Sequence, residues 1–330
     1  MNKFLSYIVL VLPFFAFNQS YAPPVGYEGT TAIYMDSNVF VAWASGIEVY
    51  RGYLNIEDKS YEIDGSNKAS FGEPENAIGY ADGTSTDVVS LGDSGIAIMT
   101  FNKPIINGPG YDFAVFENSF NDDYLELAHV EVSSDGEHYV RFPSHSEVQT
   151  QEQTGSFGST DAREIYNLAG KYRGGYGTPF DLKELKDSAG IDVNSITHVK
   201  IIDVVGSIGE GGTNDSFGNR INEPFPTAFE SGGFDLDAVG VIHQLAHLDE
   251  LDHTKMISVY PNPFQDYLTV ESKNTSPFQL TLLDASGKII FKKDNITEKQ
   301  KLTLNTIEPG VYFICIAQEN HIIRQKVIKQ

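Results

Sequence analysis

Short apolar runs alternate with turn-forming residues along most of this 330-residue chain. Between residues 23 and 247 the runs are separated by Gly, Pro, Asn and Asp, as in Asn107-Gly108-Pro109-Gly110. Short runs with period-two alternation and frequent turns are typical of β-strands. The predicted strands of this segment are Val39–Ala44, Val88–Leu91, Gly95–Phe101, Asp112–Glu117, Leu127–Ser133, His198–Val205 and Leu236–His243.

Helical patterns are almost missing from the same segment. The one weak helix candidate is Leu182–Ala189, which follows Pro179. No repeat with a period of 20–50 residues is visible, which disfavours a propeller or a solenoid. We therefore expect an all-β chain, with a large jelly-roll β-sandwich over residues 23–247.

The last 73 residues have their own strand pattern. Turn signals such as Asp284-Ala285-Ser286-Gly287 and Glu308-Pro309-Gly310 separate the apolar runs. Five such runs in about 70 residues predict a small, Ig-like antiparallel β-sandwich over residues 258–330. A polar stretch at 248–257 is then a candidate linker. The predicted strands are Leu268–Glu271, Gln279–Leu283, Lys288–Phe291, Lys301–Leu304 and Val311–Ile316.

The first 22 residues have the pattern of a secretory signal peptide. Lys3 precedes the apolar run Ile8–Phe17, and Ser20-Tyr21-Ala22 places small residues at the two positions that determine cleavage. The apolar run is too short to span a bilayer, which disfavours the alternative of an N-terminal anchor helix. No later segment has 18 consecutive apolar residues, so we predict no transmembrane segment in the mature chain.

Charge and cysteine content exclude several classes of function. The net charge is −22, and residues 23–247 hold 35 acidic against 12 basic residues, whereas residues 248–330 hold ten of each. An acidic surface disfavours binding to nucleic acid or anionic lipid, because both attract clustered Lys and Arg. Cys315 is the single cysteine, which excludes an intrachain disulfide and every cysteine-cluster metal site.

Several motifs of the last segment agree, in order, with one known family. They are the start Val259-Tyr260-Pro261-Asn262-Pro263-Phe264, the strand–turn–strand at 282–290, the run 308–314 and the basic end Lys326-Val327-Ile328-Lys329. Residues 258–330 thereby resemble the type A C-terminal sorting domain of the type IX secretion system of Bacteroidota. The resemblance implies contact with that secretion machinery, passage through the periplasm and the outer membrane, and a secreted or cell-surface location. It implies nothing about activity.

The central segment resembles bacterial cell-surface proteins built on a discoidin-like or carbohydrate-binding-module-like jelly roll. The resemblance implies surface display and ligand binding. The stretches that carry it are 42–46, 71–74, 89–95, 110–118, 131–136, 176–182, 199–203 and 233–239.

Carboxylates within the predicted strands are the first candidate site. Alternation places Asp235 and Asp237 on one face of their strand, and Phe234, Leu236 and Ala238 on the other. Buried carboxylates need a cation or hydrogen-bond donors, and converging carboxylates suit calcium. A structural Ca²⁺ is one reading, capping of turns by the carboxylates is the second, and a catalytic pair is the third. The candidate metal ligands are Asp112, Glu117, Asp203, Asp235 and Asp237.

Aromatic residues in loop-like segments are the second candidate site, because rings flanked by polar groups suit stacking on sugars or other flat ligands. Tyr172 and Tyr176 flank Arg173-Gly174-Gly175, which favours their exposure, whereas Trp43 is expected in the core. The predicted ligand-binding residues are Phe120, Tyr124, Tyr172 and Tyr176.

Other motifs do not support catalysis, and we predict no catalytic residue. The Gly-rich loop at 206–219 lacks the Lys-Ser/Thr of a phosphate loop. The pair His243 and His247 has zinc-protease spacing, but Gln244 replaces the required general base. We expect a non-enzymatic protein that binds a glycan or another small nutrient. The alternatives are an adhesion or accessory subunit that contacts an outer-membrane uptake receptor, and a secreted hydrolase such as a glycosidase.

Overall fold

The computed structural model describes residues 20–245, 257–272, 277–285, 287–297, 299–318 and 321–330. The chain forms two compact units, Met1–Leu245 and Ala246–Gln330. Strands dominate both units, so the predicted all-β sandwich class is confirmed. The predicted signal run Ile8–Phe17, the linker core and His247 lie outside the described residues. Among the described residues, no helix combines the length and apolarity that a membrane crossing requires.

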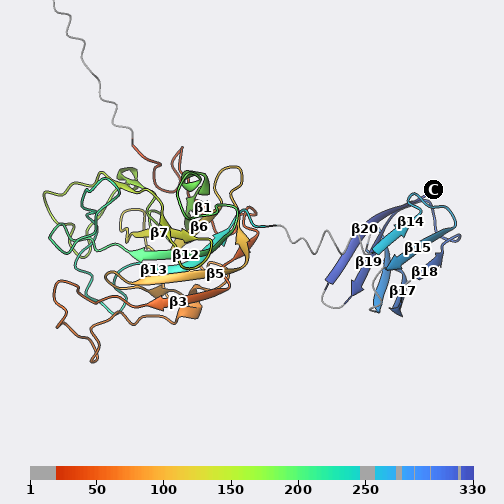
Figure 1. Ribbon diagram of the computed structural model, residues 1–330, viewed down its shortest axis with the longest axis horizontal. Coiled ribbons are helices and arrows are strands. Elements are labelled where there is room, and N and C mark those ends of the chain that lie inside the picture. The colour runs from red at the N-terminus through yellow and green to blue at the C-terminus, as the bar shows by residue number, and fades with distance from the viewer. Residues whose placement is uncertain (1–19, 246–256, 273–276, 286, 298, 319–320) are drawn as a thin grey trace, which may run out of the picture. The chain divides into compact units, whose positions relative to one another are not determined.

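The N-terminal unit is built on two antiparallel sheets (Figure 1). The first sheet has the strand order β1 (Ile33–Tyr34), β11 (Tyr176–Phe180), β6 (Phe113–Glu117), β13 (Asp235–Val241) and β2 (Ala42–Trp43), and β4 (Val89–Ser90) also pairs with β13. The second sheet has the order β3 (Gly46–Tyr50), β5 (Ile96–Ile105), β12 (Ile196–Asp203), β7 (Ala128–Ser133) and β8 (Val140–Arg141).

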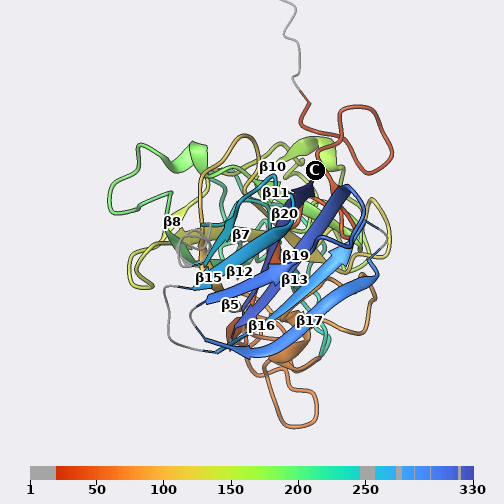
Figure 2. The same ribbon diagram turned by 90° about the vertical axis from the view of Figure 1, so that its right-hand side faces the viewer.

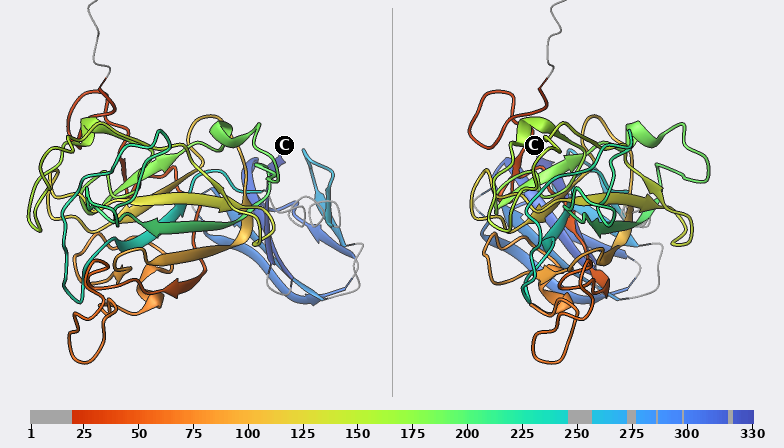
Figure 3. Two further views of the ribbon diagram at one scale, coloured as in Figure 1. Left: turned by 60° about the vertical axis from the view of Figure 1, so that its left-hand side comes forward. Right: turned by 90° about the vertical axis from the view of Figure 1, so that its left-hand side faces the viewer.

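Short elements complete the unit. A two-stranded ribbon joins β9 (His145–Ser146) to β10 (Ile165–Tyr166). Three 3-10 turns are present, η1 (Pro74–Ala77), η2 (Ala162–Glu164) and η3 (Leu182–Leu185). The helix candidate Leu182–Ala189 shortens to η3, capped by the Asp181 carboxylate, which accepts from the Lys183 amide. Long connections leave the sheets, and the segment between β3 and β4 projects from the sandwich in orange (Figure 3).

The main core lies between the two sheets, because one face of each strand is apolar. Phe113 of β6 stacks on Phe180 of β11 with ring centroids 5.3 Å apart, and Met99 of β5 and Val199 of β12 are fully buried in the same cluster. A smaller cluster covers the outer face of the first sheet, where Phe116 contacts Trp43. Trp43 is therefore partly buried against the sheet, as expected for a packing residue.

A β-bulge changes the predicted alternation of β13. Leu236 pairs with Glu117, but Ala238 pairs with Phe116, so one extra residue is inserted on β13. Leu236 consequently enters the main core, whereas Ala238 joins the outer cluster with Phe116. The expectation that Phe234, Leu236 and Ala238 share one face is therefore wrong at Ala238.

The C-terminal unit is a smaller sandwich. One sheet has the order β14 (Ile257–Tyr260), β15 (Tyr267–Ser272) and β18 (Lys299–Thr303). The other sheet has the order β17 (Ile289–Ile296), β16 (Phe278–Asp284), β19 (Gly310–Gln318) and β20 (His321–Lys329), and Figure 2 shows these strands side by side. Phe264, Leu280 and Ile314 are among the buried side chains of its separate core.

Candidate functional site

A hollow of about 350 Å³ lies at the end of the N-terminal sandwich where β6 ends and β13 begins. Four aromatic side chains line it, together with two carboxylates. We call this hollow the aromatic pocket. Its volume falls in the range of small-molecule sites, which begins at about 300 Å³. Its lining residues are Asn118, Ser119, Phe120, Asn121, Tyr124, Glu126, Phe157, Gly158, Ser159, Phe229, Ser231 and Asp235.

Three phenylalanines of the pocket are unusually exposed. Phe120 is 75% exposed, Phe157 80% and Phe229 40%. Phe157 and Phe229 come from different loops, yet their ring centroids lie 5.7 Å apart, and Phe120 lies 6.5 Å from Tyr124. The pocket therefore has an apolar rim assembled from three segments that are distant in sequence.

Local turns fix the β6–β7 loop that carries Phe120 and Tyr124. The Asn121 side-chain oxygen accepts hydrogen bonds from the amides of Asp123 and Tyr124, at 2.8 and 2.7 Å. Such Asx turns are a common way for Asn to set loop geometry. The Arg173 guanidinium donates to Asp122 at 2.5 Å and ties this loop to the segment before β11.

Glu126 precedes β7 and lines the pocket while being only 6% exposed. Gly170 packs against its backbone, because a Cβ at Gly170 would lie 1.8 Å from the Glu126 carbonyl oxygen. Gly170 also has a φ of +81°, which favours glycine. Among the described residues, no hydrogen-bond donor or ion-pair partner contacts the Glu126 carboxylate.

The other pocket carboxylate, Asp235, has partners. It accepts hydrogen bonds from the Ser90 hydroxyl and, at 3.1 Å, from the Asn118 side-chain amide. Burial raises the pKa of Asp235 to about 6. Burial also raises the pKa of Glu126 well above its usual range, and the negative charges of Asp235 and Glu117 raise it further.

The five carboxylates proposed for calcium do not converge on one point. Asp112 precedes β6 and Glu117 ends it, so about 16 Å separates them at ~3.3 Å per residue. Asp112 accepts from the amides of Gly108 and Leu182 and pairs with His243 at 2.8 Å. Asp203 accepts from two further amides.

Backbone amides also donate to two of the three remaining calcium candidates, whereas the donors to Asp235 are side chains. Asp237 accepts from the amides of Asp82 and Gly83, both at 3.0 Å, and Glu117 accepts from the Ser119 amide at 2.8 Å. In the described ranges, no group of three His, Cys, Asp or Glu is arranged to hold a metal ion. The carboxylates thus serve mainly as acceptors for backbone amides, and a calcium site made of all five does not fit this geometry.

The predicted ligand-binding aromatics separate into two groups. Phe120 and Tyr124 lie together in the aromatic pocket. Tyr172 is 1% exposed, and its hydroxyl lies 2.8 Å from the Thr31 hydroxyl, so the expectation of an exposed Tyr172 is wrong. Tyr176 is half-buried beside Tyr34 and does not line the pocket.

Sequence reasoning missed Glu126, Phe157 and Phe229. Phe157 lies between Ser156 and Gly158, and an apolar ring within a Gly/Ser turn is a signal that could have identified it. Glu126 lies between Leu125 and Leu127, where burial of the neighbours could have indicated an enclosed carboxylate.

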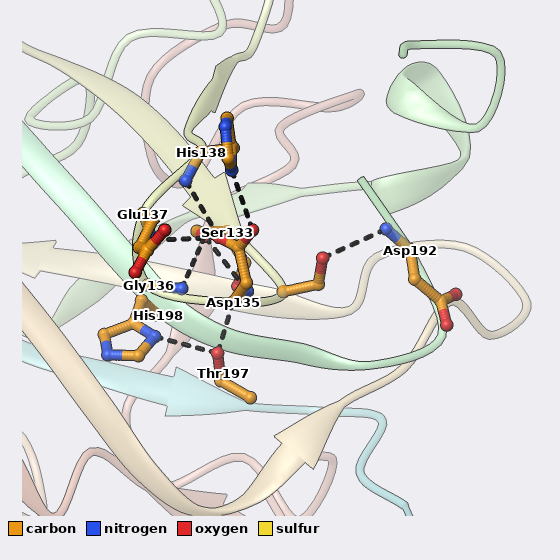
Figure 4. A network of polar contacts seen from close by, with 9 residues as sticks. Ser133, Asp135, Gly136, Glu137, His138, Asp192, Thr197 and His198 are labelled. Atoms are coloured by element: carbon orange, nitrogen blue, oxygen red, sulfur yellow. Dashed lines mark hydrogen bonds and ion pairs between the residues drawn. The ribbon is translucent and has the colours of Figure 1, made fainter. Parts of the chain in front are cut away.

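A second polar cluster serves the turn between β7 and β8 (Figure 4). The Asp135 carboxylate accepts from the amides of Glu137 and His138, both at 2.8 Å, and lies 2.8 Å from His138 Nδ1. The His138 amide is the main cause that holds the pKa of Asp135 well below its usual range. The Ser133 hydroxyl accepts from the Gly136 amide at 2.9 Å. These groups satisfy one another within a tight turn, as expected for a structural motif.

Comparison with known families identifies the C-terminal unit. Residues 258–330 match the family described as the secretion system C-terminal sorting domain. The resemblance of this segment to a type IX sorting domain is thereby confirmed, which implies interaction with the secretion machinery and a secreted or cell-surface location. The match leaves residues 1–257 unassigned. No curated protein sequence matches the chain.

Similarities to solved structures are faint. PorZ, described as an essential bacterial surface component of the type-IX secretion system of Porphyromonas gingivalis, is 16% identical with a TM-score of 0.21, over 28% of this chain and 14% of PorZ. β-Glucuronidases of Faecalibacterium prausnitzii and Lactobacillus rhamnosus are 11% and 10% identical, with TM-scores of 0.20 and 0.21. The matches cover 90% and 94% of this chain but only 46% of each glucuronidase. Scores this low support no inference about activity.

Proposed function

We propose that this chain is a binding protein, exported by the type IX system, that holds a glycan or another small nutrient in the aromatic pocket. The sorting domain supplies the route of export. The N-terminal unit supplies the pocket. On this proposal, residues 23–247 share ligand binding with the discoidin-like or carbohydrate-binding-module-like proteins that their sequence resembles.

The exposure of three phenylalanines around one hollow carries the proposal. Single exposed apolar residues are ordinary, but a cluster of them exposed to water is uncommon unless it binds something. Phe120, Phe157 and Phe229 belong to three loops that meet at this hollow. Because the hollow is concave, a small ligand fits it better than the broad face of another protein does.

A glycan array with the full chain tests this function. We expect binding to at least one glycan and at least a tenfold loss of affinity in Phe157→Ala. Phe217→Ala is the matched control, because Phe217 is 73% exposed, lies outside the pocket and contacts His145 instead. Loss of binding in both variants, or no binding to any glycan or small nutrient, would contradict the proposal.

The two alternatives make different predictions in the same assay. An adhesion or accessory subunit would bind an outer-membrane receptor with an affinity that Phe157→Ala leaves unchanged. A glycosidase would release reducing ends from the bound glycan and would lose this activity in Glu126→Gln, because such enzymes use a pair of carboxyl groups. We expect binding without any release of reducing ends.

A further inference from the structure

Four carboxylates are buried at and beneath the aromatic pocket without a cation. The exposures are 1% for Glu117, 6% for Glu126, 3% for Glu223 and 6% for Asp235. These four groups also interact electrostatically. In addition to burial, the negative charge of Asp235 raises the pKa of Glu117. The charges of Asp235, Glu117 and Glu223 raise the pKa of Glu126, and the charge of Glu117 raises the pKa of Glu223. In the part of the chain that the structure describes, none of the four forms an ion pair with Lys, Arg or His.

Hydrogen bonding compensates these four groups unequally. Glu223 accepts from the Leu127 amide at 2.6 Å, and Asp235 has two side-chain donors. The Ser119 amide donates to Glu117, whose Oε1 atom is buried without a partner. The Glu126 carboxylate has no hydrogen-bond or ion-pair partner among the described residues, and its oxygens, unlike Oε1 of Glu117, are open to the pocket although the residue is only 6% exposed. Native proteins rarely leave buried polar groups in this state, so each such case requires an explanation.

The positive charge that acts on Asp235 is already in use elsewhere. Arg51 is the cation whose charge acts on Asp235. Its guanidinium donates to the carbonyl oxygens of Phe71, Ser90 and Gly72, and not to a pocket carboxylate. The two carboxyl groups that line the pocket, Glu126 and Asp235, therefore form no ion pair within the described residues, and a bound cation would favour their ionised form.

The aromatic rim adds a second feature that favours a cation. Ring faces attract cations electrostatically, and the attraction grows when water is excluded. Phe120, Phe157, Phe229 and Tyr124 surround the hollow that Glu126 and Asp235 also line. A metal ion suits this environment poorly, because apolar rings offer no oxygen ligands and the described residues contain no three-residue metal group.

We propose that the aromatic pocket selects a ligand with an organic ammonium group, held by Glu126 and Asp235 and enclosed by the rings of Phe120, Phe157 and Phe229. This inference rests on the proposed binding function and specifies its ligand class. An amino sugar and a lysine side chain share this chemistry, and the test below distinguishes these two sources.

Calorimetric titration of the full chain at pH 6.5 tests the inference with three probes. Fully deacetylated chitotriose carries ammonium groups, and fully N-acetylated chitotriose is its uncharged match. Nα-Acetyl-lysine methylamide represents a lysine side chain. We expect one of the two ammonium probes to bind at least tenfold more tightly than the acetylated trimer. The stronger of the two ammonium probes identifies the source.

Variants assign the selectivity to the pocket. Glu126→Gln should lower the affinity for the ammonium probe at least tenfold while leaving any binding of the acetylated trimer unchanged. Glu62→Gln is the matched control, because Glu62 is exposed and lies outside the pocket. A single cooperative thermal unfolding transition in each variant would show that both variants fold.

Three results would overturn the inference. One is equal or stronger binding of the acetylated trimer, which would leave the proposed binding function intact but remove the preference for ammonium. A second is no binding of either ammonium probe. In that case, glycan binding that is lost in Phe157→Ala would still support the proposed function. Binding of an ammonium probe that survives in Glu126→Gln would likewise place the cation elsewhere.

Discussion

Glu126 and Asp235 line the same pocket, but only Asp235 has hydrogen-bond donors. Asp235 begins β13, whose next residue pairs with Glu117 at the end of β6, and Glu126 lies two residues before β7. The two sheets of the sandwich therefore bring these carboxylates together at one end of the unit. Because Glu126 has no such donor among the described residues, replacing its side chain breaks no hydrogen bond of that part of the folded protein. A variant at Glu126 therefore tests ligand binding separately from folding.

The buried carboxyl groups predict that stability falls as the pH rises. Burial raises the pKa values of Asp235, Asp237 and Asp93 to about 6, and raises those of Glu117, Glu126, Glu223 and Asp203 well above their usual range. The folded state then binds more protons than the unfolded chain, so the contribution of these groups is fully present below about pH 4 and is lost as the pH rises through their folded-state pKa values, which are about 6 for Asp235, Asp237 and Asp93. His129, whose pKa burial lowers to about 4, and Lys171, whose pKa burial lowers to about 8, act in the opposite direction, but the seven buried carboxyl groups outnumber them.

Thermal unfolding at several pH values tests this prediction without added ligand. We expect a higher melting temperature at pH 5.5 than at pH 8, and a smaller difference in Glu126→Gln, because that variant removes one of the titrating groups. A melting temperature that is equal or higher at pH 8 would contradict the prediction. In the presence of a bound ammonium ligand, the difference between the two pH values should shrink.

Tyr21 is predicted to belong to the folded mature chain. Its hydroxyl lies 2.5 Å from His145 Nδ1, its ring centroid lies 5.1 Å from that of Tyr166, and its amide donates to the Arg163 carbonyl at 2.9 Å. Cleavage after Ala22, which the signal pattern of residues 1–22 predicts, would remove these contacts, so the folded structure favours a cleavage site at least two residues earlier. We therefore expect sequencing of the secreted protein to find an N-terminus at or before Tyr21.

Substitution of Tyr21 tests the same contacts in the folded protein. Tyr21→Ala should lower the unfolding free energy by about 1 kcal/mol, the usual contribution of an aromatic pair. Tyr21→Phe should cost less, because it keeps the ring and removes only the hydroxyl. A mature chain that begins at Pro23 and melts at the same temperature as one beginning at Tyr21 would show that these contacts are dispensable.

Removal of residues 258–330 should abolish export without unfolding the N-terminal unit. That unit has its own core around Phe113, Met99 and Val199, and the sorting domain has a separate one. We expect the shortened chain to accumulate in the periplasm, as measured by immunoblots of cell fractions. Phe157→Ala in the full chain is the control and should be exported normally. Export of the shortened chain would show that another segment carries the sorting signal.

Chelation is the direct test of the calcium prediction. Asp112, Asp203 and Asp237 already accept backbone hydrogen bonds, and the five candidates do not meet at one point. We therefore expect EDTA to leave the melting temperature unchanged to within about 1 °C. A fall that added calcium reverses would instead establish a structural calcium site.

The strand pattern could be predicted because it is local. Each predicted strand overlaps an observed one, for example Leu127–Ser133 with β7, since alternation directly reflects one buried face. The predicted fate of Tyr172 failed because its Gly-rich neighbours indicated a loop, whereas its hydroxyl bonds with Thr31, 141 residues away in sequence. The bulge in β13 also has no local signal, because it arises from pairing with β6.

Half of the aromatic pocket was predictable for the same reason. Phe120 and Tyr124 are close in sequence and flanked by polar residues, so one loop identified both. Glu126 follows two residues later, but a single carboxylate between leucines gives no sign of its missing partners. Phe157 and Phe229 lie 72 positions apart, and only the folded chain brings their rings together.

Amide hydrogen exchange of the full chain, with and without a saturating ammonium ligand, tests the central claim most directly because it locates the ligand. We predict slower exchange at residues 118–126, 156–159 and 229–235, where the pocket is lined, and no change in the sorting domain. Protection confined instead to the separate hollow lined by Tyr21, Tyr111 and Lys171, or no protection at all, would contradict the account.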